Sequence, residues 1–175
     1  APMPWEKRFD VDETLTRVMH AFWTHGYEAT SMSRLAATAG VAPNTIYWYF
    51  KDKDEVLVAV LDAEFSASVE GYVLLSASNP TDRMLWVASQ LERVSRLVST
   101  VHSRLEKSAT INAWHDQFHL LSEEMLRFEL QQAGVAPEMI EARVKISVFT
   151  IEGLIAHQLP DSEKRDICAA LLCVS

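Results

Sequence analysis

The sequence is poor in features on which several classes of protein depend. It has two cysteines in 175 residues, and no apolar run approaches the roughly 18 residues that a membrane-spanning helix needs. Cys168 and Cys173 are five residues apart on an expected helix and point to different faces, so we expect no disulfide between them. The opening residues, APMPWEKRFD, lack the apolar core of a secretion signal. Together these absences predict a cytoplasmic protein with its thiols reduced.

Positive charge is also scarce. The chain has 16 basic and 24 acidic residues, a formal net charge of −8. Residues 1–55 hold six basic and eight acidic residues, so this part is close to neutral and the acidity is concentrated beyond it. A nonspecific nucleic-acid binder gains affinity by neutralising phosphates, and this composition argues against one. Any nucleic-acid binding must therefore rest on a few well-placed cations and oriented hydrogen bonds.

Motifs of enzymes are missing as well. The sequence has no nucleophile elbow, no glycine loop for phosphates and no zinc-protease motif, so we predict no enzymatic activity and no cofactor. His115 and His119 are four residues apart and could hold a metal ion from one helix face, with Glu123 in line. No further ligand has a convincing spacing. We therefore predict no metal site, and expect the two histidines to face a ligand or the surface.

The residues that are present predict an all-α protein. Hydrophobic residues make up 49% of the chain, enough for a sizeable core, and they recur at helical spacing without strand-like alternation. Glycines and prolines mark the expected ends, because glycine terminates helices and proline is accepted in their first turn. We expect helices over residues 10–25, 31–39, 43–50, 52–65, 80–105 with a break, 111–114, 117–133, 137–158 and 162–174. Residues 66–79 are expected to form a helix tail and a loop.

Residues 30–53, TSMSRLAATAGVAPNTIYWYFKDK, are the most informative stretch. Two short helical patterns flank Gly40, and the second pattern carries Asn, Thr, two Tyr and a Trp within six residues. This is typical of a helix-turn-helix, in which one helix braces and the next enters the major groove of DNA. Thr30, Ser31 and Ser33 lie near the start of the first helix, where they could bind phosphate or simply cap the helix.

The same region resembles the N-terminal domain of the TetR family of transcriptional regulators. The resemblance runs in a fixed register without gaps, although Ala42 stands where a capping Ser is common. The matching residues are Phe22, Gly26, Tyr27, Thr30, Ser31, Leu35, Ala36, Ala39, Gly40, Val41, Thr45, Ile46, Tyr47, Phe50, Lys53 and Leu57. The resemblance implies a DNA-binding domain over residues 1–51 and a helical domain over residues 52–175 that binds an effector and forms a dimer.

The resemblance also implies roles for the residues around the second helix. Asn44, Thr45 and Tyr49 are expected at base edges, while Tyr47, Trp48 and Lys53 are expected at phosphates or a thymine methyl. Alternatively, Tyr47 and Trp48 pack the small domain, and Lys53 is a solvated lysine.

Bulky apolar residues in the middle of the chain admit two interpretations. In an all-helical domain most of them form the core. The resemblance implies an inducer pocket between the central helices, and aromatic and Met side chains suit flat or flexible apolar ligands. We expect a lipophilic effector, with a cationic one favoured by the acidic domain. The candidate residues are Met84, Trp86, Trp114, Phe118, Met125 and Phe128.

The sequence therefore predicts a one-component regulator, with repression the commoner mode in the family it resembles. The helices over 117–133 and 137–158 would pair with a second copy, placing two reading helices about 34–36 Å apart on a near-palindromic operator. The alternative from another class is a helical ligand-binding or protein-interaction module without operator binding, which the acidic balance favours. An enzyme is the third alternative.

Overall fold

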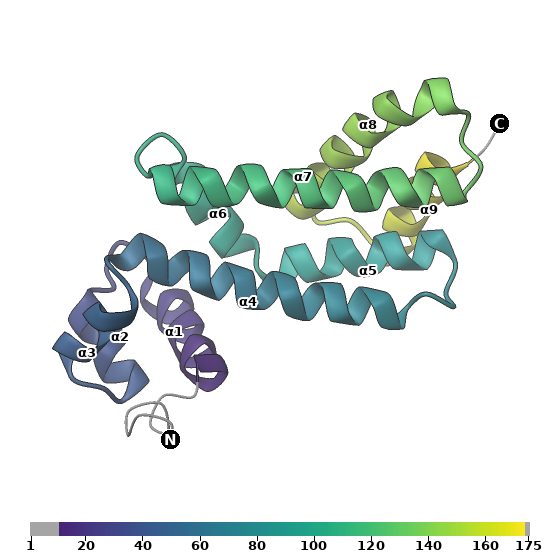
Figure 1. The fold of residues 1–175 in the computed structure, drawn as a ribbon. Coiled ribbons are helices and arrows are strands. Elements are labelled where there is room, and N and C mark those ends of the chain that lie inside the picture. The colour runs from purple at the N-terminus through teal and green to yellow at the C-terminus, as the bar shows by residue number, and fades with distance from the viewer. Residues whose placement is uncertain (1–10, 174–175) are drawn as a thin grey trace, which may run out of the picture. The chain divides into compact units, whose positions relative to one another are not determined.

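In the computed structural model, the described residues 11–173 form nine helices and no strand, which confirms the all-α prediction (Figure 1). None of these helices combines the length and apolar character needed to cross a membrane. Asp10 and Val174, at the ends of the expected helices over 10–25 and 162–174, lie outside the described residues. The helices are α1 (Val11–His25), α2 (Met32–Ala39), α3 (Pro43–Tyr49), α4 (Lys53–Leu74), α5 (Pro80–Arg93), α6 (Ser95–Arg104), α7 (Ala109–Gln132), α8 (Pro137–Ala156) and α9 (Asp161–Leu172).

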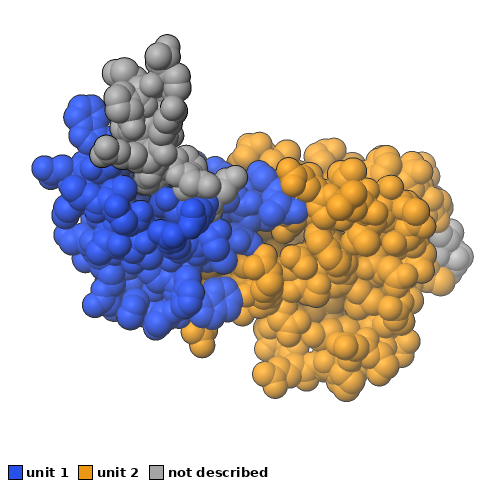
Figure 2. Space-filling view, turned by 90° about the horizontal axis from the view of Figure 1, so that it is seen from below, with its two compact units in different colours: residues 1–67, 99–114 blue, residues 68–98, 115–175 orange. Residues whose placement is uncertain are grey.

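The chain forms two compact units, coloured blue and orange in Figure 2. The first unit takes the chain up to Ala67 and again over Ser99–Trp114, and the second takes Ser68–Val98 and the chain from His115 onward. The chain crosses between them three times, inside α4, α6 and α7. The expected functional boundary near residue 51 stays a prediction, because the compact units divide the chain at other positions.

The helix-turn-helix of the first unit forms as its turn residues predict. Ser31 caps α2, since its Oγ accepts a hydrogen bond from the Arg34 backbone N–H at 3.1 Å. Gly40 ends α2 with φ +73°, a conformation that glycine adopts without strain. Pro43 then opens α3. Asp52 caps α4 by accepting from the Glu55 backbone N–H at 3.0 Å.

Residues 66–79 form the helix tail and the loop that were expected, because α4 continues through Gly71 to Leu74 and α5 begins at Pro80. One predicted helix boundary is wrong. The helix α7 is continuous from Ala109 to Gln132, where the sequence suggested separate helices over 111–114 and 117–133. Polar residues caused this error, because on the exposed side of a long helix they interrupt the apolar pattern without ending the helix.

Gly71 lies inside α4 at a position where the indole of Trp86 occupies the space that a larger side chain would need. A Cβ at this position would lie 2.7 Å from Trp86 Cζ2 and 2.8 Å from Cη2. Alanine normally stabilises a helix relative to glycine by about 1 kcal/mol. We expect Gly71→Ala instead to lower the free energy of unfolding by about 1–3 kcal/mol, because the indole must move.

Urea unfolding followed by circular dichroism checks this prediction. Gly153 in α8 provides a matched control, since nothing lies within 4 Å of a Cβ built there. Gly153→Ala should therefore gain the ordinary helix stabilisation of about 1 kcal/mol. Equal gains in both variants would contradict the close packing of Trp86 on Gly71.

The second unit combines an apolar core with a buried polar network. The network joins α4, α5 and α7: Arg83 Nη2 lies 2.8 Å from Glu129 Oε2, and the Tyr72 hydroxyl donates to the same carboxylate. Burial of the phenol, followed by its bond to Glu129, raises the pKa of Tyr72. The core residues are Met84, Ala88, Leu130, Val135, Ile140, Val144, Leu154, Cys168 and Leu172.

Candidate nucleic-acid interface

The short helix α3 presents a polar and aromatic face to solvent. Leu35 and Ala36 of α2 and Ile46 of α3 are buried, so they hold the two helices together. On the other side of α3, Asn44 is exposed, Tyr47 is 55% exposed and Trp48 is 87% exposed. Neighbouring exposed apolar side chains often mark a site of interaction with a partner. This face therefore has the composition that a DNA-reading helix requires.

The other candidate residues for DNA contact differ in their accessibility. Ser33 and Ser31 are exposed at the start of α2, and Thr45 and Tyr49 are half-buried on α3. Thr30 is fully buried, and its hydroxyl donates to the Gly26 carbonyl at 2.6 Å. Its hydroxyl thus stabilises the turn before α2, and this placement does not support a phosphate contact.

Lys53 is similarly engaged within the protein. Its Nζ donates to the Tyr27 carbonyl at 2.8 Å and lies 4.3 Å from the centroid of the Tyr27 ring. The ammonium group therefore attaches the start of α4 to the α1–α2 connection. An ammonium group has three N–H donors, so this bond leaves donors for a phosphate, and the expected phosphate contact of Lys53 stays a prediction.

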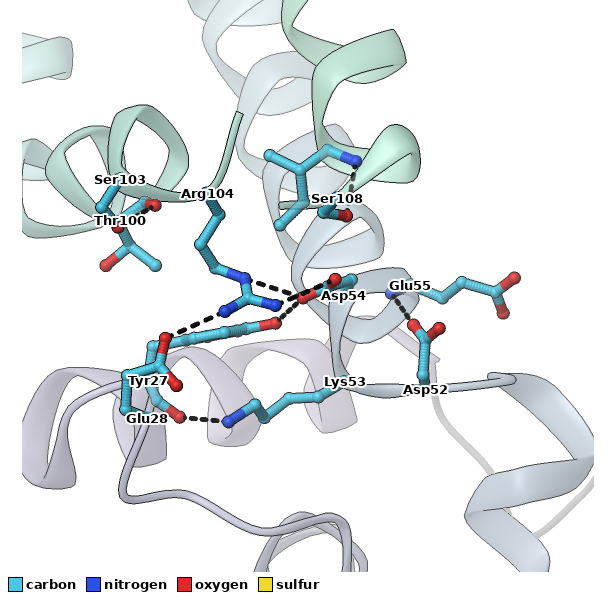
Figure 3. Close-up of polar contacts among 11 residues, drawn as sticks. Tyr27, Glu28, Asp52, Lys53, Asp54, Glu55, Thr100, Ser103, Arg104 and Ser108 are labelled. Atoms are coloured by element: carbon cyan, nitrogen blue, oxygen red, sulfur yellow. Dashed lines mark hydrogen bonds and ion pairs between the residues drawn. The ribbon is translucent and has the colours of Figure 1, made fainter. Parts of the chain in front are cut away.

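A polar cluster that the sequence did not predict lies beside Lys53 (Figure 3). Arg104, the last residue of α6, donates from Nε to Asp54 Oδ1 at 3.1 Å and from Nη2 to Asp54 Oδ2 at 3.2 Å. Its Nη1 donates to Glu28 Oε1 at 2.9 Å, and the guanidinium lies 5.0 Å from the Tyr27 ring centroid. The Tyr27 hydroxyl also donates to Asp54.

The cluster perturbs the ionisation of its members. Burial by itself raises the pKa of the Asp54 carboxyl, but hydrogen bonds from Tyr27, Arg104 and Ser108 outweigh burial and hold this pKa below its ordinary value. Burial, followed by the bond to Asp54, raises the pKa of Tyr27. Asp54 therefore remains a carboxylate and Tyr27 a neutral donor, which keeps the contacts among them intact at neutral pH.

The six candidate effector residues do not share one environment. Met84 is buried in the core of the second unit, and Phe128 is exposed on α7. Trp114 belongs to the first unit, where its indole N–H donates to Asp62 Oδ1 at 2.7 Å. Phe118 and Met125 are half-buried. The six side chains thus differ in burial and belong to two compact units, and their part in an effector site stays a prediction.

Trp86 lines a pocket of about 390 Å³ in the second unit, and the other five candidates are not among the residues that line it. Side chains of α5, α8 and α9 form its wall, and a Lys164–Glu92 ion pair of 2.9 Å lies among them. The lining residues are Leu85, Trp86, Ala88, Ser89, Glu92, Leu154, Asp161, Ser162, Lys164 and Arg165.

His115 and His119 contact each other on α7. Their Nε2 atoms are 3.0 Å apart, and both side chains are half-buried. Within residues 11–173, no three His, Cys, Asp or Glu side chains gather in a way that could hold a metal ion.

Large apolar side chains are exposed on α7 and α8. We call this set the α7/α8 apolar surface: Leu120, Leu121, Phe128, Met139, Ile146 and Phe149. On α8, Met139, Ile146 and Phe149 recur at spacings of seven and three residues, so they share one side of the helix. The buried residues Ile140, Val144 and Ile151 lie on another side. The helix α8 therefore has two apolar faces, one of which is packed within this chain.

Comparisons with known proteins agree with the geometry. Residues 18–60 match the family described as bacterial regulatory proteins, tetR family. The HTH-type transcriptional repressor ComR of Escherichia coli is 45% identical over 56 residues, which are 32% of this chain and 27% of ComR. The fatty acid metabolism regulator protein of Bacillus subtilis is 29% identical over 65 residues, 37% of this chain and 34% of that protein. The matches thus span about a third or less of these relatives.

The fold is shared over a greater length. A transcriptional regulator from Rhodococcus sp. RHA1 superposes with a TM-score of 0.75, covering 93% of this chain and 94% of the other, at 17% sequence identity. At this identity the likeness establishes the arrangement of helices alone. The sequence match therefore concerns the N-terminal region alone, whereas the structural match concerns the fold of nearly the whole chain.

Proposed function

Because the chain belongs to the TetR family of transcriptional regulators, we propose that it represses transcription by binding a near-palindromic operator as a homodimer and that a small lipophilic effector releases it. The observation that carries the proposal is the outward face of α3, where Asn44, Tyr47 and Trp48 are exposed beside a buried helix-turn-helix core. ComR, which shares this region, is named a repressor.

For the DNA contacts we assign roles by exposure and chemistry. Asn44, Thr45 and Tyr49 would approach base edges, and Tyr47 and Trp48 would contact phosphates or a thymine methyl. Ser31 and Ser33 would meet phosphate at the start of α2, where backbone N–H groups also point outward. Thr30 is left out of this interface, because its hydroxyl is bonded within the protein. Lys53 would contact a phosphate through the ammonium N–H groups that its bond to the Tyr27 carbonyl does not use.

The chain has too few basic residues to bind DNA tightly by neutralising phosphates, and dimerisation would provide the missing affinity for the operator. The α7/α8 apolar surface offers a patch for a second copy, and α7 and α8 are joined at its edge by Arg127, whose Nε donates to Glu141 Oε1 at 2.7 Å. A twofold interface would present two copies of α3 to the two halves of an operator. Each copy then needs few contacts, since their contributions combine.

The effector is proposed to be lipophilic because aromatic and Met side chains are abundant in α5 and α7. One relative is named for fatty acid metabolism, which agrees with an apolar ligand. The effector would act by binding more tightly to the state of the dimer that does not fit the operator. The shift in operator affinity equals this difference between the two states, so tight binding without a difference would have no effect.

A DNA-binding measurement tests the proposal. Fluorescence anisotropy with labelled duplexes from the region flanking the protein's own gene should reveal a site with a dissociation constant on the order of 10⁻⁸ M or lower at physiological salt. An excess of unrelated duplex should not displace the protein from it. Uniformly weak binding to every duplex would favour the alternative, a helical ligand-binding or protein-interaction module without operator binding.

A further inference from the structure

Arg104 contacts both ends of the helix-turn-helix stretch although it lies about 50 residues beyond it. Glu28 belongs to the connection before α2, and Asp54 belongs to the first turn of α4, directly after α3. The guanidinium donates to Asp54 through Nε and Nη2 and to Glu28 through Nη1, at 2.9–3.2 Å (Figure 3). One side chain thus joins a residue before α2 to the first turn of α4, on either side of the helix-turn-helix.

Partial burial distinguishes this contact from an ordinary surface ion pair. The side chains of Arg104 and Asp54 are 18% and 17% exposed, whereas Glu28 is 76% exposed. Two parallel N–H bonds to one carboxylate also fix the guanidinium plane in a way that a single bond does not. The Asp54 bonds therefore hold Arg104 in place, and the Glu28 bond attaches the α1–α2 connection to it.

We propose that Arg104 is a positioning residue for operator binding, which fixes the orientation of the helix-turn-helix without touching DNA. This inference rests on the proposed function. The helix-turn-helix has its own buried contacts, Leu35, Ala36 and Ile46, so it should stay folded when Arg104 is replaced. The replacement instead leaves its two ends less restrained. Operator binding must then restore their order, and this cost lowers the affinity.

The test compares Arg104→Gln with Lys107→Gln in the full chain. Lys107 is exposed three residues away and loses the same charge, which makes it a matched control. Anisotropy with the operator duplex should show about tenfold weaker binding for Arg104→Gln and unchanged binding for Lys107→Gln. The slope of log affinity against log salt concentration should be the same for all three proteins, because a positioning residue neutralises no phosphate.

A second variant and a double substitution separate positioning from general stability. Arg104→Lys keeps the charge but cannot make two parallel bonds to Asp54, so its affinity should lie between those of the wild type and Arg104→Gln. Asp54→Asn should weaken binding by itself and add little to Arg104→Gln, because both changes remove the same contact. Independent, multiplicative losses from the two substitutions would contradict a shared role.

The outcomes are distinguishable from failure of the proposed function. If the wild type binds no operator, the proposed function is wrong and this inference falls with it. If the wild type binds and Arg104→Gln binds equally well or more tightly, the inference alone is wrong. A salt slope reduced by about 1 in Arg104→Gln would assign Arg104 a direct phosphate contact, which also overturns positioning.

Discussion

Phe149→Glu is expected to prevent the proposed dimer from forming and to weaken binding to the proposed operator by roughly 10²–10⁴-fold. Phe149 is 68% exposed within the single chain and shares its side of α8 with Met139 and Ile146. In a dimer these side chains would be desolvated, and a carboxylate among them would be buried without a partner. Both half-sites would then be bound by separate molecules, and the gain from linkage would be lost.

Sedimentation velocity at micromolar concentration measures the first effect, since the monomer has a mass of 19.8 kDa. Anisotropy with the full operator measures the second. Asn112→Glu is the control, because it places the same side chain at an exposed position of α7 outside the α7/α8 apolar surface. If Phe149→Glu remains a dimer, or if the wild type is already a monomer, this surface has another role.

The second large effect is expected from Asn44→Ala. Asn44 is exposed at the start of α3, where its amide could donate to and accept from the edge of an adenine. Loss of such a contact costs about 1–3 kcal/mol, and a twofold dimer loses it at each half-site. Operator affinity should therefore fall by about 10²-fold or more. The thermal midpoint of unfolding should change little, because no buried contact is removed.

The sequence dependence of binding provides the sharper readout for Asn44→Ala. The variant should lose discrimination at one symmetric pair of operator positions and retain it elsewhere, which competition with single-substituted duplexes will reveal. Asn112→Ala removes an identical side chain from an exposed position of α7 and should leave binding unchanged. A loss that is uniform over all duplexes would show that Asn44 does not read a base.

Helix positions were predictable where local chemistry determines them. Gly40 ends α2 and Pro43 opens α3 because a left-handed turn and a missing N–H favour these residues, whatever packs around them. The continuity of α7 was not predictable in the same way. The exposed polar residues next to His115 interrupt the apolar pattern, whereas the buried residues Ile111 and Leu130 lie near the two ends of the helix.

The candidate site was predictable in its outward face but not in its supports. Exposure of Trp48 follows from the helical positions of Leu35 and Ile46, which must pack inward. The internal bonding of Lys53 depends instead on the Tyr27 carbonyl, 26 residues earlier, and Arg104 reaches Asp54 across 50 residues. No periodicity or spacing connects such residues, so contacts of this kind become visible only when the chain is folded.

The three helical crossings between the compact units limit how this chain can be divided or recombined. Domains usually meet at exposed linkers, which tolerate cleavage and exchange. Here a cut at residue 51 would separate the DNA-reading helix from Val56, Leu57, Val60 and Leu61, the buried residues of α4 in its own unit. A chimaera that exchanges the second unit must therefore retain α4 up to Ala67 together with Ser99–Trp114, because two separate stretches of the chain build the first unit.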